Sequence, residues 1–276
     1  MPLKSLPAFK AVLLICLSAT LQADIMVTQL ANEGVIVSDG ATRIMIDGMV
    51  VEPYSVYGGL PPDAANQFDR VSGAFSGIDL ALVSHRHHDH NQPDFACRFM
   101  QGSAATRLVS SPQVLGLMRE KCRQFITTSP RVREISPDYE QAHEFQRGSA
   151  YITVFPLSHG TRKYSRIQNF GHLIKMGGLT VLHVGDAAMD DTDFAHFGLD
   201  QVEIDIALIP FWFFQPGPGE SVVKKFMDAP VKIAVHIPPG EMEQVTTHMQ
   251  AGFPEVIILA KPLDQASFSG TARPLP

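Results

Sequence analysis

The chain has 276 residues, which suits one large domain or two small ones and is long enough for a sizeable hydrophobic core. Apolar residues make up 45% and charged residues 18%, which is the composition of a globular protein and excludes a largely disordered one. The formal net charge of −6 argues against a nucleic-acid backbone as the main partner.

The first 23 residues have the pattern of a secretory signal peptide. Lys4 and Lys10 precede an apolar run at 11–17, and small or polar residues follow it. A retained membrane anchor and a buried helix are the alternatives, but the run is too short to span a bilayer comfortably. We therefore expect a signal peptide at 1–23, a single domain at 24–276, and an exported, periplasmic protein with no membrane anchor after cleavage.

Removal of that segment leaves two cysteines, Cys97 and Cys122. An even number of cysteines in an exported chain permits a disulfide. Two buried free thiols are the alternative, and the sequence leaves the choice open because pairing depends on geometry.

Strands are expected at 25–30 and within 35–47. Asp39-Gly40 separates two β-rich runs in the second range, which is typical of a hairpin turn. Asp47 ends this hairpin. Residues 52–77 are rich in Gly, Pro and Ser, and they indicate a long loop.

A buried strand is expected at 78–83, and the eight residues after it read S-H-R-H-H-D-H-N. Four of these residues, at the spacing H-x-H-x-D-H, are candidate ligands of a transition metal: His85, His87, Asp89 and His90. Imidazole suits zinc, iron and nickel, and a carboxylate adds a harder ligand. The cluster holds more ligands than one tetrahedral ion with an open position needs, so two metals could share it. The alternative is a polar surface loop that happens to be rich in histidine.

The rest of the chain alternates between helical and β-rich segments. Helices are expected from Pro93 to Met100, from Pro112 through Phe125, and at 190–197, 221–227 and 241–249. Strands are expected at 107–110, 151–157, 170–176, 179–184, 205–210, 231–235 and 255–259. The tail after Lys261 shows no clear pattern.

Three further polar residues follow strands of this series: His159, Asp186 and His236. In open α/β sheets ligands gather beyond the carboxyl ends of strands, so these positions favour a shared site. Asp186 could otherwise cap the helix that follows, and a lone histidine is weak evidence by itself. His183, on the strand before Asp186, is expected to pack or support rather than bind.

The motif H-x-H-x-D-H resembles the signature of the metallo-β-lactamase-fold hydrolases, and the later residues match that family in order and spacing. The resemblance implies an α/β fold, the αβ/βα four-layer sandwich, with two sheets face to face and helices outside. It also implies a ligand set, in which Asp186 bridges two metals, His85, His87 and His159 hold one of them, and Asp89, His90 and His236 hold the other. By the same resemblance Asp47 stands behind the metal site, with an ordinary turn residue as the alternative.

The resemblance implies a metal-dependent hydrolase. Two divalent ions, with Zn²⁺ favoured and Fe or Mn as alternatives, would lower the pKa of a shared water, and the resulting hydroxide would cleave the substrate. Asp89 is the expected catalytic residue, because a carboxylate there could orient the nucleophile or relay its proton.

The phrases N-F-G-H-L-I and V-L-H-V-G-D-A resemble lactonase and phospholipase-D-like members of the family. They favour cleavage of an ester, lactone or phosphodiester in a small-molecule substrate. A β-lactam hydrolase and a non-catalytic metal or ligand binder are the alternatives. Arg162 and Tyr164 could clamp an anionic group or belong to a solvated loop. Trp212 and Phe213 could form a pocket wall or a core run.

Overall fold

The computed structural model describes residues 23–136 and 138–270. The signal peptide expected at 1–23 therefore lies, except for Ala23, outside the described residues. Within the described ranges, no helix has both the length and the hydropathy needed to cross a lipid bilayer.

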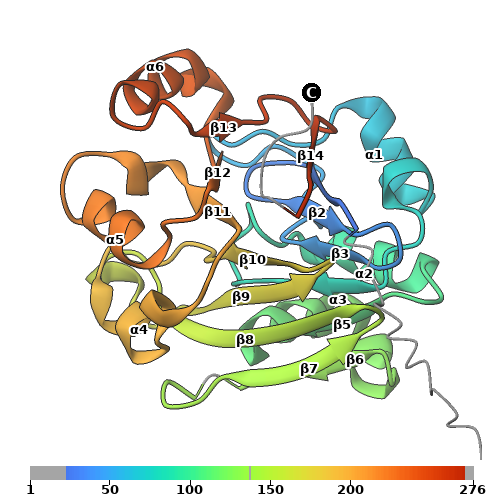
Figure 1. Cartoon of the computed structure of the whole chain (residues 1–276). Helices are drawn as coiled ribbons and strands as arrows, with labels where there is room; N and C mark the ends of the chain where they lie inside the picture. Colours follow the sequence, from blue (N-terminus) through green and yellow to red (C-terminus); the bar gives the residue numbers. More distant parts are fainter. Residues whose placement is uncertain (1–22, 137, 271–276) are drawn as a thin grey trace, which may run out of the picture.

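The described residues form two mixed sheets that pack face to face (Figure 1). The first sheet contains, from edge to edge, β14 (Gln265–Phe268), β1 (Ile25–Gln29), β2 (Val35–Ser38), β3 (Arg43–Ile46), β4 (Leu80–Leu82), β5 (Arg107–Ser110) and β6 (Val132–Glu134). The second contains β13 (Ile257–Ile258), β12 (Val231–Val235), β11 (Ile206–Pro210), β10 (Leu179–His183), β9 (Gln168–Met176), β8 (Ala150–Ser158) and β7 (His143–Arg147).

Helices cover the outer face of each sheet. The first sheet carries α1 (Pro62–Asp69), α2 (Pro93–Gly102) and α3 (Pro112–Thr128), and the second carries α4 (Asp191–His196), α5 (Pro218–Phe226) and α6 (Met242–Gly252). Figure 1 shows α4, α5 and α6 together on the left and α1 on the right.

Successive side chains of a strand point to opposite faces of its sheet, and this explains why each sheet packs against the other sheet on one face and against helices on the other. In β3, Ile44 and Ile46 face the core between the sheets, whereas Met45 faces the helices. In β11, Leu208 enters the same central core and Ile209 packs under the helices of the other side. Both faces of each sheet are thus apolar, because each is covered. The result is the four-layer sandwich, and this confirms the predicted fold class.

A disulfide joins Cys97 in α2 to Cys122 in α3. The structure thereby selects the bridge over two free thiols. The start of α3 also agrees with the sequence: Pro112 occupies the first turn, and the Ser111 hydroxyl accepts a hydrogen bond from the backbone of Val114.

Several elements differ from the sequence-based expectations. The expected loop at 52–77 contains α1, whose Phe68 is completely buried against Phe75 and Phe99, so the prediction of an unstructured loop is wrong. The tail after Lys261 forms β14, which pairs with β1. Strands β6 and β7 also lay outside the predicted set. The hairpin at Asp39-Gly40 is confirmed, since β2 and β3 pair antiparallel around it.

Candidate metal centre

All seven predicted ligands meet where strands of both sheets end. His85, His87, Asp89 and His90 follow β4, which belongs to the parallel part of the first sheet. The other three ligands follow strands of the second sheet that run in one direction: His159 after β8, Asp186 after β10 and His236 after β12. The site therefore lies at the seam between the two sheets, beyond their carboxyl ends.

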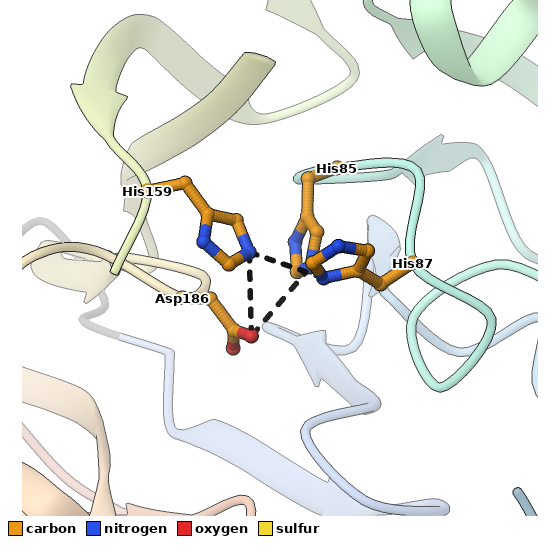
Figure 2. A group of neighbouring side chains, drawn as sticks. All are labelled: His85, His87, His159 and Asp186. Carbon is orange, nitrogen blue, oxygen red and sulfur yellow. Dashed lines mark hydrogen bonds and ion pairs between the residues drawn. The ribbon is translucent and has the colours of Figure 1, made fainter. Parts of the chain in front are cut away.

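Three histidines and one carboxylate form a first cluster (Figure 2). His87 Nδ1 lies 3.0 Å from His85 Nε2 and 3.2 Å from His159 Nε2. Asp186 Oδ2 lies 3.6 Å from His85 Nε2 and 3.5 Å from His159 Nε2. These four ligand atoms surround one point.

A second cluster shares the same aspartate. His90 Nε2 and His236 Nε2 are 3.0 Å apart, and Asp186 Oδ1 lies 3.2 Å from the first and 3.3 Å from the second. Asp89 Oδ2 lies 3.4 Å from His236 Nε2 and 3.9 Å from His90 Nε2. Asp186 thus turns one carboxylate oxygen toward each cluster.

These distances fit metal coordination. Zinc–nitrogen bonds of about 2.0–2.1 Å in a tetrahedron place neighbouring ligand atoms roughly 3.3–3.4 Å apart, close to the spacings found here. Asp186 Oδ1 is buried and has no hydrogen-bond partner among the described residues. A cation at each cluster would satisfy that oxygen as well as the converging ring nitrogens.

Burial sets the protonation of the first cluster. Burial lowers the pKa of His85 well below its usual value, lowers that of His87, and lowers that of His159 to about 4. All three rings are therefore neutral at pH 7, which is the form that binds a metal.

The two carboxylates remain ionised. For Asp186 burial acts to raise the pKa, but the charges of His90 and His236 outweigh it and hold the pKa well below the usual value. For Asp89 burial is likewise outweighed, here by the hydrogen bond from His236 and the charge of His90, and the pKa is lowered. Both side chains thus offer negative charge to a cation.

Gly185 shapes the turn that delivers Asp186. Its φ is +55°, and an added Cβ would stand 2.3 Å from Asn169 Oδ1 and 2.8 Å from the Ser84 Cβ. Asn169 ties this turn to β9, because its side chain donates to the Val184 carbonyl and accepts from the Asp186 amide. Position 185 therefore requires glycine, because Asn169 and Ser84 leave no room for a side chain there, and position 186 supplies the carboxylate.

His236 also has a positive φ, of 65°. Such a conformation is uncommon for a residue with a side chain, and it concentrates at functional sites. The Asn32 carbonyl accepts a hydrogen bond from the His236 amide, and the Asn32 side chain donates to the backbone carbonyl of Asp89. Asn32 thus links two of the ligand-bearing segments.

Asp47 lies behind the second cluster and is completely buried. It accepts hydrogen bonds from the Ser84 amide at 2.7 Å, from the Ser84 hydroxyl, and from His90 Nδ1 at 2.8 Å. The structure therefore selects the role implied by the family resemblance over that of a simple turn residue. His183 is also buried behind the site, as expected of a supporting residue.

Glu33 is a residue that the sequence did not indicate. It is completely buried, with Oε1 3.2 Å from His183 Nε2 and Oε2 3.9 Å from His90 Nδ1. Burial raises the pKa of its carboxyl well above the usual value and so favours the protonated, neutral form. No local signal could have found it, because A-N-E-G is the pattern of an ordinary turn.

A pocket of about 590 Å³ opens over the two clusters. Tyr164 and Trp212 line it, as expected. Arg162 does not: it is exposed on the 3-10 turn η2 (Arg162–Tyr164). Phe213 is completely buried against Phe194, so its prediction as a pocket wall is wrong. In the short turn η4 (Phe211–Phe214) neighbouring side chains point in different directions, which separates Trp212 from Phe213.

Solved structures of three other proteins have a similar fold. Igni18, a metallo hydrolase of Ignicoccus hospitalis, aligns with a TM-score of 0.59 at 17% identity, over 89% of this chain and 99% of that chain. CmlA, a diiron β-hydroxylase from Streptomyces venezuelae, aligns with a TM-score of 0.55 at 15% identity, over 91% of this chain and 55% of that chain. The short form of human tRNase Z aligns with a TM-score of 0.53 at 15% identity, over 88% of this chain and 98% of that chain. Such low identities show the fold alone.

No curated protein matches the sequence. A family model described as the beta-lactamase superfamily domain matches residues 43–258, a span that begins at β3 and ends at β13. The match covers most of the chain and includes the seven predicted ligands. The chain therefore belongs to the beta-lactamase superfamily, and it has the metallo-β-lactamase fold.

Proposed function

We propose that this protein is a dinuclear metal-dependent hydrolase that cleaves an ester, lactone or phosphodiester bond of a small molecule. The observation that carries the proposal is Asp186, whose two oxygens face two separate groups of imidazoles. A carboxylate in that position keeps two cations close together, as two-metal sites require.

The ligand roles follow from the two clusters. His85, His87 and His159 would hold one ion, Asp89, His90 and His236 the other, and Asp186 would bridge them. Bound divalent ions supply Lewis-acid chemistry: they lower the pKa of water and stabilise negative charge on a substrate oxygen. The mixed nitrogen and oxygen set favours Zn²⁺, with Fe or Mn as alternatives.

Asp89 is the proposed catalytic residue. It lines the pocket, and its lowered pKa keeps the carboxylate ionised, so that it can accept a hydrogen bond from a nucleophile and orient it. Asn32 Nδ2 lies 3.4 Å from Asp89 Oδ2 and limits the rotation of the carboxylate. Tyr57 lines the same pocket, and burial raises its pKa to about 12, so its hydroxyl stays protonated and can donate a hydrogen bond.

We further propose that the protein is exported to the periplasm as a single domain at 24–276, without a membrane anchor. The positive and apolar pattern at 1–23 supports export. The Cys97–Cys122 bridge supports it independently, since disulfides persist in oxidising compartments. N-terminal sequencing of the protein from a periplasmic extract would test the cleavage site; a chain that keeps residues 1–23 would contradict it.

The function is tested by metal analysis and turnover on chain 24–276. We expect about two metal ions per chain, and hydrolysis of at least one member of a panel containing an ester, a lactone, a thioester, a phosphodiester and a β-lactam. His87→Ala and Asp186→Asn should each abolish turnover and lower the metal content. His248→Ala, at an exposed histidine on α6, is the matched control and should change neither.

Two results would contradict the proposal. At most one metal per chain, with no turnover after metal supplementation, would indicate a binding protein. Cleavage of the β-lactam alone would indicate a β-lactam hydrolase. Metal identity is measured in the same experiment, because CmlA shows that this fold also accommodates a diiron β-hydroxylase.

A further inference from the structure

We infer that the pocket over the metal centre binds an uncharged apolar group, the aryl or alkyl part of an ester or lactone, and disfavours an anionic phosphodiester. The inference rests on the proposed function, because it names the substrate class of the same site. Three observations carry it: the aromatic walls, the absence of lysine and arginine from the lining, and the apolar residues exposed at the mouth.

Aromatic rings stand directly against the ligand histidines. The centre of the Tyr57 ring lies 4.4 Å from the centre of the His236 ring, and the centre of the Trp212 ring lies 4.8 Å from that of His236. Both pairs meet edge-on. Tyr164 lies 5.2 Å from His159 and 5.4 Å from His87. A substrate bond placed at the metals would therefore have aromatic surface beside it from both clusters. Such walls bind apolar groups through burial and ring contacts.

The pocket lining contains carboxylates but no lysine or arginine. Its charged side chains are Asp89 and Asp186, both assigned to the metals. Arg162 and Lys163 lie in the neighbouring turn but do not line the pocket, and the Lys163 ammonium stands 5.0 Å from the centre of the Tyr164 ring. Recognition of a phosphate normally uses Arg or Lys donors. Beyond the metals, an anionic group would find no lysine or arginine side chain in this lining.

The mouth of the pocket exposes large apolar side chains. Tyr54 is 48% exposed, Val56 57% and Met189 41%. Val56 is held at the tip of a tight turn, because Tyr54 and Tyr57 exchange backbone hydrogen bonds across it. Among the described residues, six large apolar side chains are exposed to this degree; Tyr54 and Met189 line this pocket, and Val56 stands in the chain between the lining residues Ser55 and Tyr57. Exposed apolar surface at a pocket rim marks a contact for ligand that extends outward.

The first test compares p-nitrophenyl acetate, butyrate and octanoate with bis(p-nitrophenyl) phosphate on the metal-loaded enzyme. Each buried methylene is worth about fourfold, so burial of only two of the added methylenes would raise kcat/KM by about tenfold or more from acetate to octanoate. The phosphodiester should be the poorest substrate. Met189→Ser and Tyr54→Ser should flatten the dependence on chain length. Met26→Ser and Tyr151→Ser are matched controls, since these residues are 40% and 43% exposed but lie outside the lining.

A second test measures binding without turnover. Trp212 is the only tryptophan in the chain, so its fluorescence reports on the pocket alone. Phenylpropanol, which is neutral and has no hydrolysable bond, should change this fluorescence saturably and at much lower concentration than propanol does. The Met189→Ser variant should weaken the response, and the Met26→Ser variant should not.

The two tests separate the inference from the proposed function. Saturable phenylpropanol binding without hydrolysis of any panel substrate would overturn the function and support the apolar pocket. Hydrolysis that favours the phosphodiester, with no dependence on acyl length and no phenylpropanol response, would overturn the inference and leave the hydrolase intact.

Discussion

Asp47 and His90 lie 2.8 Å apart, with the Asp47 carboxylate at Nδ1 of the ring. A carboxylate can only accept this hydrogen bond, so the proton is on Nδ1. The opposite nitrogen, Nε2, is thereby aimed at Asp186 and His236. Asp47 therefore fixes the orientation of a proposed ligand without touching the metal, and in the neutral ring that binds a metal it holds the single proton on Nδ1.

Replacement of Asp47 tests this arrangement. Asp47 has a φ of 47°, which Asn tolerates, so Asp47→Asn should fold. Its amide offers one acceptor oxygen for three donors, and we expect metal affinity to fall by about 10–100-fold. Competition with a chromogenic chelator measures this. Ser38→Ala, at a buried polar residue away from the site, is the control. Unchanged affinity in Asp47→Asn would contradict the role assigned to the hydrogen bond.

Glu33 should behave as a neutral side chain. Because burial raises its pKa well above the usual value, Gln is its closest match in shape and charge. In chelator-treated protein at pH 7, we expect Glu33→Gln to change the free energy of unfolding by less than about 1 kcal/mol. Glu33→Ala should cost about 2–3 kcal/mol, because it removes the carboxyl that lies 3.2 Å from His183 Nε2 and opens a cavity. Urea unfolding measures both; equal costs would show that a charged carboxylate is needed.

The Cys97–Cys122 bridge should contribute substantially to stability. It closes a loop of 25 residues between α2 and α3, which corresponds to about 3–4 kcal/mol of chain entropy in the unfolded state. Reduction should therefore lower the urea midpoint, and the double variant Cys97→Ala/Cys122→Ala should reproduce the shift and be insensitive to reductant. Metal content should not change, because neither sulfur belongs to the clusters. A midpoint unaffected by reductant would show that the bridge does not form.

Because His172 is buried, we expect the free energy of unfolding to fall in acid. It is buried on β9, and burial lowers its pKa from 6.5 to about 3. Between these values the unfolded chain binds a proton that the folded chain does not, so stability is full above pH 6.5 and falls as the pH decreases. We compare the free energy of unfolding of chelator-treated protein at pH 7 and pH 5. Over this range the His172→Leu variant should lose about 2 kcal/mol less of it than wild type does. The control variant His248→Leu, at an exposed histidine, should show the same pH dependence as wild type. If the unfolding free energies of wild type and both variants changed equally with pH, His172 would not be the group responsible.

Local patterns predicted most of the fold and the proposed ligands. The strands before His85, His159, Asp186 and His236 are short apolar runs, and a run that ends in a polar metal-binding residue is visible without tertiary information. Their meeting at one seam follows from the common direction of the strands.

The remainder depends on contacts between distant segments. Glu33 is buried because β10 and the segment after β4 close over a turn that looks solvent-exposed in sequence. Trp212 and Phe213 are adjacent aromatics, and only the geometry of η4 sends one to the pocket and the other to the core. The four residues of β14 form a strand because β1 offers an edge.

That last pairing bears on how the protein is made. Strand β14 is the final strand of the described chain, yet it completes the sheet that β1 begins, and Ile25 pairs with Phe268. During synthesis β1 therefore emerges more than two hundred residues before its neighbour, and its outer backbone groups have no strand to pair with. A nascent or truncated chain that stops after β13 would display this open edge, which is a template for association with other chains. Strand β14 thus covers the edge of β1 and becomes the four-residue edge of the finished sheet, and such a short edge offers few backbone groups to another chain.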